Sequence, residues 1–280
     1  MGSSVVRCLA VGAACAFFAQ AGNAQAVLLQ IRPHIGDTLR MHLSQTVEMT
    51  GTTYLSGPGS TRSMTTSMEV FTRAIAKQWT SSGTLMQAIT DSVAMDPSSP
   101  ASLAELRHRA MESQTVWLRV STDGAMEMVG DGDANSELRR TFGEMPATLA
   151  RNAVKVGERW TREMRIPLSG EPGSVGSVRA TFQLDSLGRH GDVAYISMRG
   201  TMSRISMPSA PPPGAGYETS GTLTGTMQID RRLGWITDSR STIIVRSTVV
   251  ASPGKRGEAR RAPMYVKTRI TQWIRAMRAR

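Results

Sequence analysis

The residues best suited to metal binding or acid–base catalysis are few and widely spaced. The chain of 280 residues has four histidines, and no two of them form a closely spaced pair of metal ligands: His34, His42, His108 and His190. The H-E-x-x-H pattern of zinc proteases is also missing. We therefore expect no metal site, and we interpret the four histidines as surface or turn residues.

One acidic stretch, residues 131–144, resembles a calcium-binding loop in its first half. Carboxylate or amide side chains fall there at alternate positions: Asp131, Asp133, Asn135 and Glu137. The sixth position is Ser136 instead of glycine, and the twelfth is Phe142 instead of glutamate, so the pattern fails where the loop needs its turn and its bidentate ligand. A turn followed by a helix N-terminus explains the same residues.

Motifs for other common chemistries are absent from the sequence. It contains no G-x-S-x-G elbow, no P-loop and no dinucleotide-binding fingerprint. Paired carboxylates for glycoside hydrolysis meet only in the folded chain, so spacing does not exclude them. Because the acidic residues number only 22 and aromatic residues are sparse, we expect no enzyme, no catalytic residue and no cofactor, with a hydrolase as a less favoured alternative.

The N-terminus has the features of a signal peptide. One positive charge at Arg7 precedes a short apolar run, and Ala24 and Ala26 then supply the small-x-small spacing that a signal peptidase recognises. The apolar run is shorter than the ~20 residues of a membrane-spanning helix. We predict a signal peptide over residues 1–26, a mature chain that starts at Val27, and a periplasmic or extracellular location in a bacterial envelope.

The predicted mature chain would contain no cysteine. Both cysteines, Cys8 and Cys15, lie inside the predicted signal peptide. Thiol catalysis, disulfides and cysteine-ligated metals are therefore excluded for the mature form. No later segment is apolar enough to cross a membrane as a helix.

Charge is distributed unevenly along the chain. Residues 27–145 hold 10 Lys and Arg against 13 Asp and Glu, a balance of −3, and residues 146–280 hold 22 against 9, a balance of +13. A basic half can attract polyanions such as anionic lipid headgroups. Arginines scattered over the outer faces of strands explain the same charge, and export makes nucleic acid an unfavoured partner.

Hydrophobic residues repeat mostly with a period of two, which indicates half-buried β-strands. In the segment 221–245, Leu223, Met227 and Ile229 alternate with Thr and Gln, and Gly234 supplies a turn before a second Thr-, Ile- and Val-rich run. The same alternation marks residues 37–55, 66–79, 83–95, 116–129, 178–202 and 263–274. We predict a mainly β fold, of the β-rich α+β type, with a large curved antiparallel sheet or an open β-barrel.

Two segments have helical spacing instead. Leu103, Leu106 and Ala110 form one apolar face in residues 100–111. A second face within residues 135–152 follows steps of four, three and four: Leu138, Phe142, Met145 and Leu149. We expect two short helical segments that cover the sheet.

The chain divides by charge and pattern into an N-terminal β half with helices, residues 27–145, and a basic C-terminal β half, residues 146–280. Each half opens with a long strand after a glycine and later contains a glycine turn, so a duplicated β unit is one interpretation. A single continuous domain over residues 27–280 is the other.

Two motifs resemble a family of uncharacterised exported bacterial β proteins, some of them lipoproteins. The first is V-x-V-G-x-x-W, from Val154 to Trp160, and the second is G-x-x-x-I-D-x-x-x-G-x-I, from Gly225 to Ile236. The family contributes no catalytic residue. At the level of fold, a curved sheet with helices is similar to periplasmic carriers of lipoproteins and lipids.

These features together favour a binding protein. An apolar sheet face rich in flexible methionine can close around an apolar or lipid-like ligand. Nine methionines lie in or near predicted strands: Met64, Met68, Met86, Met95, Met126, Met128, Met198, Met202 and Met227. The alternative is a structural or interaction module with a filled core, which would dock on an envelope protein.

Overall fold

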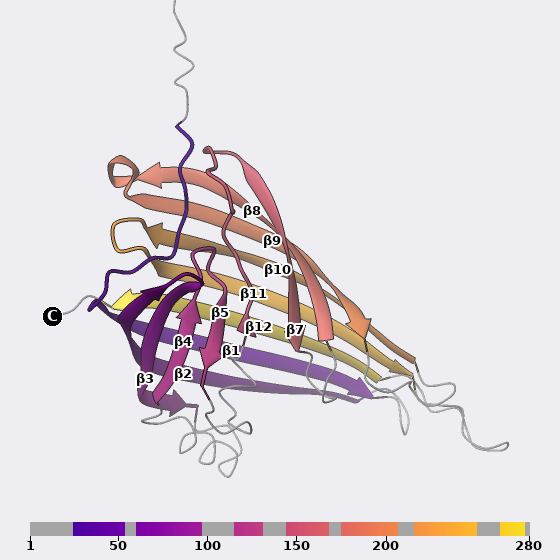
Figure 1. Ribbon diagram of the computed structural model, residues 1–280. Coiled ribbons are helices and arrows are strands. Elements are labelled where there is room, and N and C mark those ends of the chain that lie inside the picture. The colour runs from indigo at the N-terminus through magenta and orange to yellow at the C-terminus, as the bar shows by residue number, and fades with distance from the viewer. Residues whose placement is uncertain are drawn as a thin grey trace, which may run out of the picture.

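The computed structural model describes residues 25–53, 60–96, 115–130, 144–167, 175–206, 216–250 and 264–277. These residues form one antiparallel sheet of 12 strands (Figure 1). The strands are β1 Thr38–Thr53, β2 Ser60–Thr80, β3 Gly83–Met95, β4 Thr115–Val120, β5 Met126–Val129, β6 Glu144–Met145, β7 Arg159–Pro167, β8 Val175–Gly188, β9 Val193–Ser206, β10 Gly216–Asp230, β11 Trp235–Val250 and β12 Met264–Met277.

The strand order shows how the chain builds this sheet. The order is β6-β5-β4-β3-β2-β1-β12-β11-β10-β9-β8-β7, so every strand pairs with its neighbours in sequence except at the centre, where β1 pairs with β12. Both halves of the chain therefore contribute to one sheet. Figure 1 shows that the sheet is strongly curved, so that β3 to β5 fold over in front of β1 and β12.

The predicted mainly β fold with a large antiparallel sheet is confirmed. All seven segments with alternating hydrophobicity lie on strands over their described parts. In the hairpin of β10 and β11, Leu223 pairs with Ile243, and the chain reverses at Gly234, whose φ of +58° suits glycine.

The expected helices are not part of this fold. The only helix in the described residues is a 3₁₀ turn at Arg189–Gly191, and none there is long or apolar enough to cross a membrane. Residues 100–111, Leu138 and Phe142 lie outside the described ranges. The prediction for residues 144–152 was wrong: Glu144 and Met145 form β6, and the rest is irregular.

A physical reason for this correction is visible in the hydrogen bonds of residues 146–154. Pro146 has no amide hydrogen to donate within a helix. The N–H groups of Thr148 and Leu149 donate to the carbonyl of Asp123 instead, at 3.1 and 2.9 Å, and the carbonyl of Thr148 accepts from the indole of Trp160. Tertiary partners therefore replace helical ones, and Leu149 is fully buried without a helix.

The sheet has two distinct faces, which follow from the strand register. Apolar side chains gather on the inner, concave face. The most deeply buried of them lie on β3, β4, β8, β9 and β10: Met86, Val120, Ala180, Phe182, Leu184, Ala194, Ile196 and Ile229. The outer face of β11 and β12 carries mostly charged residues and threonine, with Ile244, Tyr265 and Trp273 among them.

Residues 25–36 cross one end of the sheet, which we call the covered end. Leu29 and Ile31 are each only 1% exposed there. The backbone of this segment forms hydrogen bonds with three separate segments that flank the strands. Val27 pairs with Val154, the N–H of Ile31 donates to the carbonyl of Thr122, and the N–H of Arg32 donates to the carbonyl of Gly234. The segment thus closes the core at this end (Figure 1).

Two glycines leave room for methionine side chains where β9, β10 and β11 meet. Gly221 and Gly225 on β10 lie opposite Met202 and Met198 on β9. A Cβ on Gly225 would lie 2.3 Å from the carbonyl oxygen of Arg240 and 2.5 Å from the methyl group of Met198. Because only glycine leaves this space open, the methionine side chain can lie flat across β10.

Candidate functional site

Away from the covered end, the side chains of the inner face are less completely buried. On β1, β2 and β3 it carries four methionines that we call the methionine strip: Met49, Met64, Met68 and Met95. Met49 and Met64 are register partners on β1 and β2, and Met68 pairs with Met95 across β2 and β3. Met64 is 49% exposed and the other three are half-buried. Met68 and Met95 pack against the buried pair Val70 and Val93, so this part of the face has only a small core.

On the central strands, the inner face beside the methionine strip mixes apolar residues with uncharged polar ones. Val47 on β1 pairs with Ile270 on β12, which pairs with Ile243 on β11, and all three are half-buried. The inner-facing positions of β1, β11 and β12 carry no charged side chain within the described residues, although the neighbouring row, Gln45, Gln272 and Ser241, is polar. Such a surface offers dispersion contacts and burial of apolar area, and the unbranched methionines can adapt to the shape of a ligand.

An ion pair at the covered end joins the edge strand β7 to the β4–β5 turn, near the opposite edge of the sheet. Nη2 of Arg162 on β7 lies 3.2 Å from Oδ2 of Asp123 in the β4–β5 turn, and Nε of Arg162 donates to the carbonyl of Leu149 at 2.9 Å. The two side chains are 14% and 26% exposed. Because β7 is one edge of the sheet and the β4–β5 turn lies near the other edge, this contact connects the two sides of the sheet without strand pairing.

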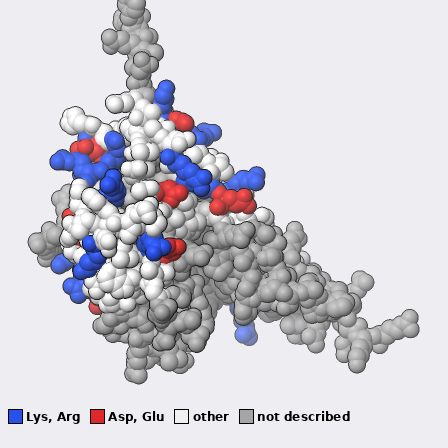
Figure 2. Space-filling view, in the orientation of Figure 1, with Lys and Arg blue, Asp and Glu red and all other residues white. Residues whose placement is uncertain are grey.

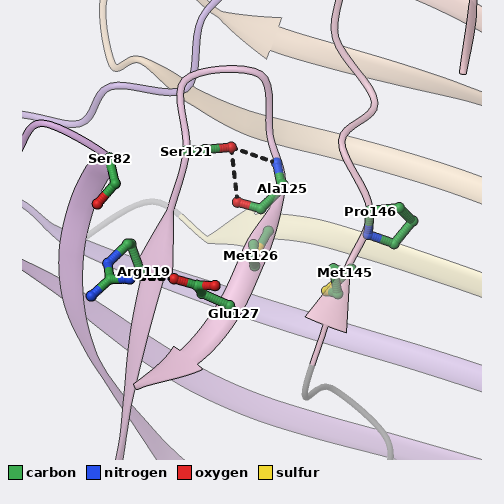
Figure 3. Close-up of a pocket in the computed structure, with 8 residues that line it drawn as sticks. All are labelled: Ser82, Arg119, Ser121, Ala125, Met126, Glu127, Met145 and Pro146. Atoms are coloured by element: carbon green, nitrogen blue, oxygen red, sulfur yellow. Dashed lines mark hydrogen bonds and ion pairs between the residues drawn. The ribbon is translucent and has the colours of Figure 1, made fainter. Parts of the chain in front are cut away.

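A pocket of about 510 Å³ lies beside this junction (Figure 3). Arg119 on β4 and Glu127 on β5 form an ion pair on one wall, and Met145 and Pro146 lie across from them. The Ser121 hydroxyl accepts from the N–H of Ala125 at 3.0 Å. Nε of Arg119 is buried without a hydrogen-bond partner. The pocket therefore combines apolar walls with polar groups that are mostly engaged with one another.

A second pocket, of about 780 Å³, lies among the turns at the covered end and is lined by seven residues: His34, Asp37, Arg189, Asp192, Asp230, Arg232 and Leu233. Its three carboxylates already have partners. Asp37 accepts from the N–H of His34, Asp192 lies 3.7 Å from Arg232, and Asp230 caps the turn by accepting from the N–H groups of Arg232 and Leu233. The three carboxylates therefore stabilise the turns that line this pocket.

The structure separates the histidines that the sequence singled out. His34 lies in the second pocket, His42 stacks on Phe71 on the outer face with ring centroids 4.4 Å apart, and His190 adopts a φ of +58° in the 3₁₀ turn. His108 lies outside the described residues. Among the described residues, no group of three or more His, Cys, Asp or Glu is placed to hold a metal ion.

Of the two alanines predicted to be recognised by signal peptidase, only Ala26 belongs to the described residues. Ala24 lies outside the described residues, and so do Cys8, Cys15 and the calcium-like loop from Asp131. Ala26 is exposed, and Val27, directly after it, is buried and paired with Val154. Cleavage between these two residues stays a prediction.

Sequence reasoning missed the Arg162–Asp123 junction. The two residues are 39 positions apart and belong to no local motif. One signal was available: Arg162 sits in the alternation of Trp160 and Met164, at a position where an inner-facing strand would carry an apolar residue. A charged side chain in that register needs a buried partner.

A comparison with protein families agrees with one part of the resemblance seen in the sequence, the likeness to an uncharacterised family. The model of a family of unknown function (DUF6263) matches residues 113–236. This part of the chain is therefore similar to DUF6263, and the match covers less than half of the 280 residues. The matched region runs from β4 to the start of β11 and includes both ends of the Arg162–Asp123 junction. No curated protein matches the chain.

The two motifs that carry the resemblance lie in the matched region and build the covered end. In the first, Val154 pairs with Val27, and Trp160 stacks on Phe182 with ring centroids 5.7 Å apart. In the second, a Cβ on Gly234 would lie 2.2 Å from the carbonyl oxygen of Arg32. The motif residues therefore have structural roles in holding the segment 25–36 against the sheet.

Proposed function

We propose that the protein is an exported, non-enzymatic β protein of a bacterial cell envelope that binds an apolar or lipid-like ligand on the inner face of its sheet. The observation that carries this proposal is the half-exposed methionine strip, continuous with Val47, Ile243 and Ile270. The covered end would be the fixed part of the molecule, and the strip would be the surface that changes on binding.

The energetics support an apolar ligand. Full burial of a methionine side chain contributes roughly 1.5–3 kcal/mol, and Met64 still exposes 49% of its surface. A hydrocarbon chain laid along the strip would complete the burial of several such side chains at once. The long strands suit an extended ligand, because β1, at 16 residues, spans roughly 50 Å at ~3.3 Å per residue.

A structural or protein-interaction module is the second candidate. The filled core at the covered end, where Phe182, Leu184 and Leu149 are fully buried, supports it. In that case the half-exposed inner face would receive a protein partner in place of a lipid. A hydrolase is the third and least supported candidate, since the carboxylates of the two pockets already hold hydrogen bonds or ion pairs.

Export rests on the apolar N-terminus and on Ala24 and Ala26. The position of Val27 supports the proposed boundary, because it is the first residue of the described chain that is buried and hydrogen-bonded to the sheet. A mature chain that began later would lose the pairing with Val154.

Native mass spectrometry of the mature chain, purified without detergent from a host that exports it, tests the proposal. Extra mass that organic solvent removes would support a lipid-like ligand, and the extracted molecule would identify its class. A bare mass, together with no uptake of a hydrophobic dye, would contradict ligand binding and would favour the interaction module.

A further inference from the structure

The outer face of β11 and β12 carries a cluster of cations that we call the basic face. It consists of five exposed side chains at alternating positions of two paired strands: Arg240, Arg246, Lys267, Arg269 and Arg275. The described part of these two strands holds a single carboxylate, Asp238. The balance on the two strands is thus +4, and all five cations point away from the apolar inner face.

Two of these cations are placed directly against each other. Arg246 on β11 and Lys267 on β12 are register partners, and their neighbours on the flanking strands are Ser220 and Thr50. This row across four strands contains no carboxylate. Like charges directly opposite each other destabilise a sheet, so a serine or threonine at either position would suit the fold better than the residue present.

The nearby carboxylates do not neutralise this pair. Asp238 accepts from the indole N–H of Trp273 at 2.9 Å and lies 3.6 Å from Arg240, and Glu48 on β1 lies 3.7 Å from Arg269. Arg246, Lys267 and Arg275 form no ion pair with any carboxylate of the described residues. These three cations are available to an external anion.

Aromatic side chains lie among the cations. The ring of Trp273 contacts the guanidinium groups of Arg240 and Arg275, whose carbon atoms lie 4.5 and 4.1 Å from its centroid. Tyr265, near the other end of β12, is 47% exposed. Tryptophan and tyrosine beside lysine and arginine are the combination that favours the interfacial region of a lipid bilayer.

We propose that the basic face docks the protein on the surface of an anionic phospholipid bilayer. The cations lie along two adjacent strands of a sheet surface, which presents them to a plane of headgroup phosphates. Lysine and arginine near such a surface are attracted by its negative potential. The inference goes beyond the proposed function, because it concerns the opposite face of the sheet and needs no ligand on the methionine strip.

The test compares two charge reversals. Figure 2 shows Lys and Arg spread over other described parts of the surface, so total charge must be separated from position. The test variant is Arg246→Glu with Lys267→Glu. The control variant is Arg151→Glu with Arg232→Glu, which changes the charge equally at two exposed residues of the covered end.

Binding is measured by co-sedimentation with phosphatidylcholine vesicles, with and without phosphatidylglycerol. We expect the unmodified chain to bind only the anionic vesicles, and salt to weaken that binding. The test variant should bind about tenfold or more weakly, and the control variant should bind nearly as well as the unmodified chain. Equal losses in both variants, or no binding by the unmodified chain, would overturn the proposal.

Two further measurements distinguish membrane docking from misfolding of the variant and from binding to nucleic acid. The single variant Arg246→Glu places a carboxylate opposite Lys267, so its thermal unfolding midpoint should rise while vesicle binding falls. A misfolded variant would lose both. Tighter binding of the unmodified chain to duplex DNA than to anionic vesicles, lost in the same double variant, would identify a nucleic-acid site and would also overturn the proposal. If the vesicle experiment overturns the docking proposal, the dye and ligand measurements on the inner face are unaffected.

Discussion

Nη2 of Arg162 lies 3.2 Å from Oδ2 of Asp123, and this single contact joins β7, at one edge of the sheet, to the turn between β4 and β5 near the other edge. The same guanidinium donates to the carbonyl of Leu149. The sheet is therefore held together at its covered end by side-chain bonds to an irregular segment, while the methionine strip lies farther along the strands.

Removal of this junction should destabilise the fold. Arg162→Met removes the donor of the Leu149 carbonyl and of Oδ2 of Asp123, whose Oδ1 still accepts from the Ser121 hydroxyl. We expect a loss of about 2–3 kcal/mol in the free energy of unfolding. Arg159→Met on the same strand removes an exposed bond to Gln183 and should cost less than about 1 kcal/mol. Urea denaturation of both variants measures the difference, and equal losses would contradict a special role for Arg162.

The glycines of β10 that pair with methionines on β9 should not tolerate a side chain. In Gly225→Ala the new methyl group would collide with the carbonyl of Arg240 and with Met198, and we expect a loss of about 1–3 kcal/mol. Gly51 lies in β1, and no heavy atom lies within 4 Å of the place that a Cβ would take there. Gly51→Ala should therefore gain roughly 0.5–1 kcal/mol, so the two alanines should shift the unfolding midpoint in opposite directions.

The segment that crosses the covered end should contribute strongly to stability. Ile31 is 1% exposed and Ile35, four residues later, is 46% exposed. Ile31→Ala should lower the free energy of unfolding by about 2–5 kcal/mol, and Ile35→Ala should change it by less than about 0.5 kcal/mol. Similar small effects in the two variants would show that residues 25–36 are not part of the folded core.

Export should remove the N-terminal segment at the predicted boundary. N-terminal sequencing of the chain recovered from the periplasm or medium should begin at Val27. Ala26→Glu should block the cleavage, because signal peptidase needs a small residue there, and Gln25→Glu should be tolerated. A mature chain that retained residues 1–26, or one cleaved beyond Val27, would contradict the assignment.

The strands could be predicted from the local sequence, because each strand has its own alternation of apolar and polar residues. The hairpin of β10 and β11 was visible in Leu223, Met227 and Ile229 and in the glycine at 234. The pairing of β1 with β12 was not predicted, since it joins the two ends of the chain. The helix expected at residues 135–152 was wrong over its described part because the spacing of Met145 and Leu149 is also compatible with an irregular segment held by Asp123 and Trp160.

The candidate site was predictable only in composition. The sequence placed the methionines on strands, but a filled core and an open face have the same alternating pattern. The structure separates them: Met86 is fully buried and Met64 is 49% exposed. That difference depends on how far the packed core formed with residues 25–36 extends along the strands, which no local pattern records.

The most direct test of ligand binding compares neighbouring residues on opposite faces of β2. Met64 and Met68 face inward, and Thr65 and Ser67 face outward on the same strand. Met64→Lys with Met68→Lys places two charges on the methionine strip, and Thr65→Lys with Ser67→Lys places the same charges on the outer face. Affinity for a fluorescent fatty acid is then measured by titration for the unmodified chain and both variants.

We predict saturable binding by the unmodified chain, little change for the outward-facing pair of lysines, and a loss of about tenfold or more for the inward-facing pair, since charged groups do not enter an apolar contact without a large penalty. Equal affinities for all three proteins, or no binding by any of them, would contradict the proposal that the inner face receives an apolar ligand.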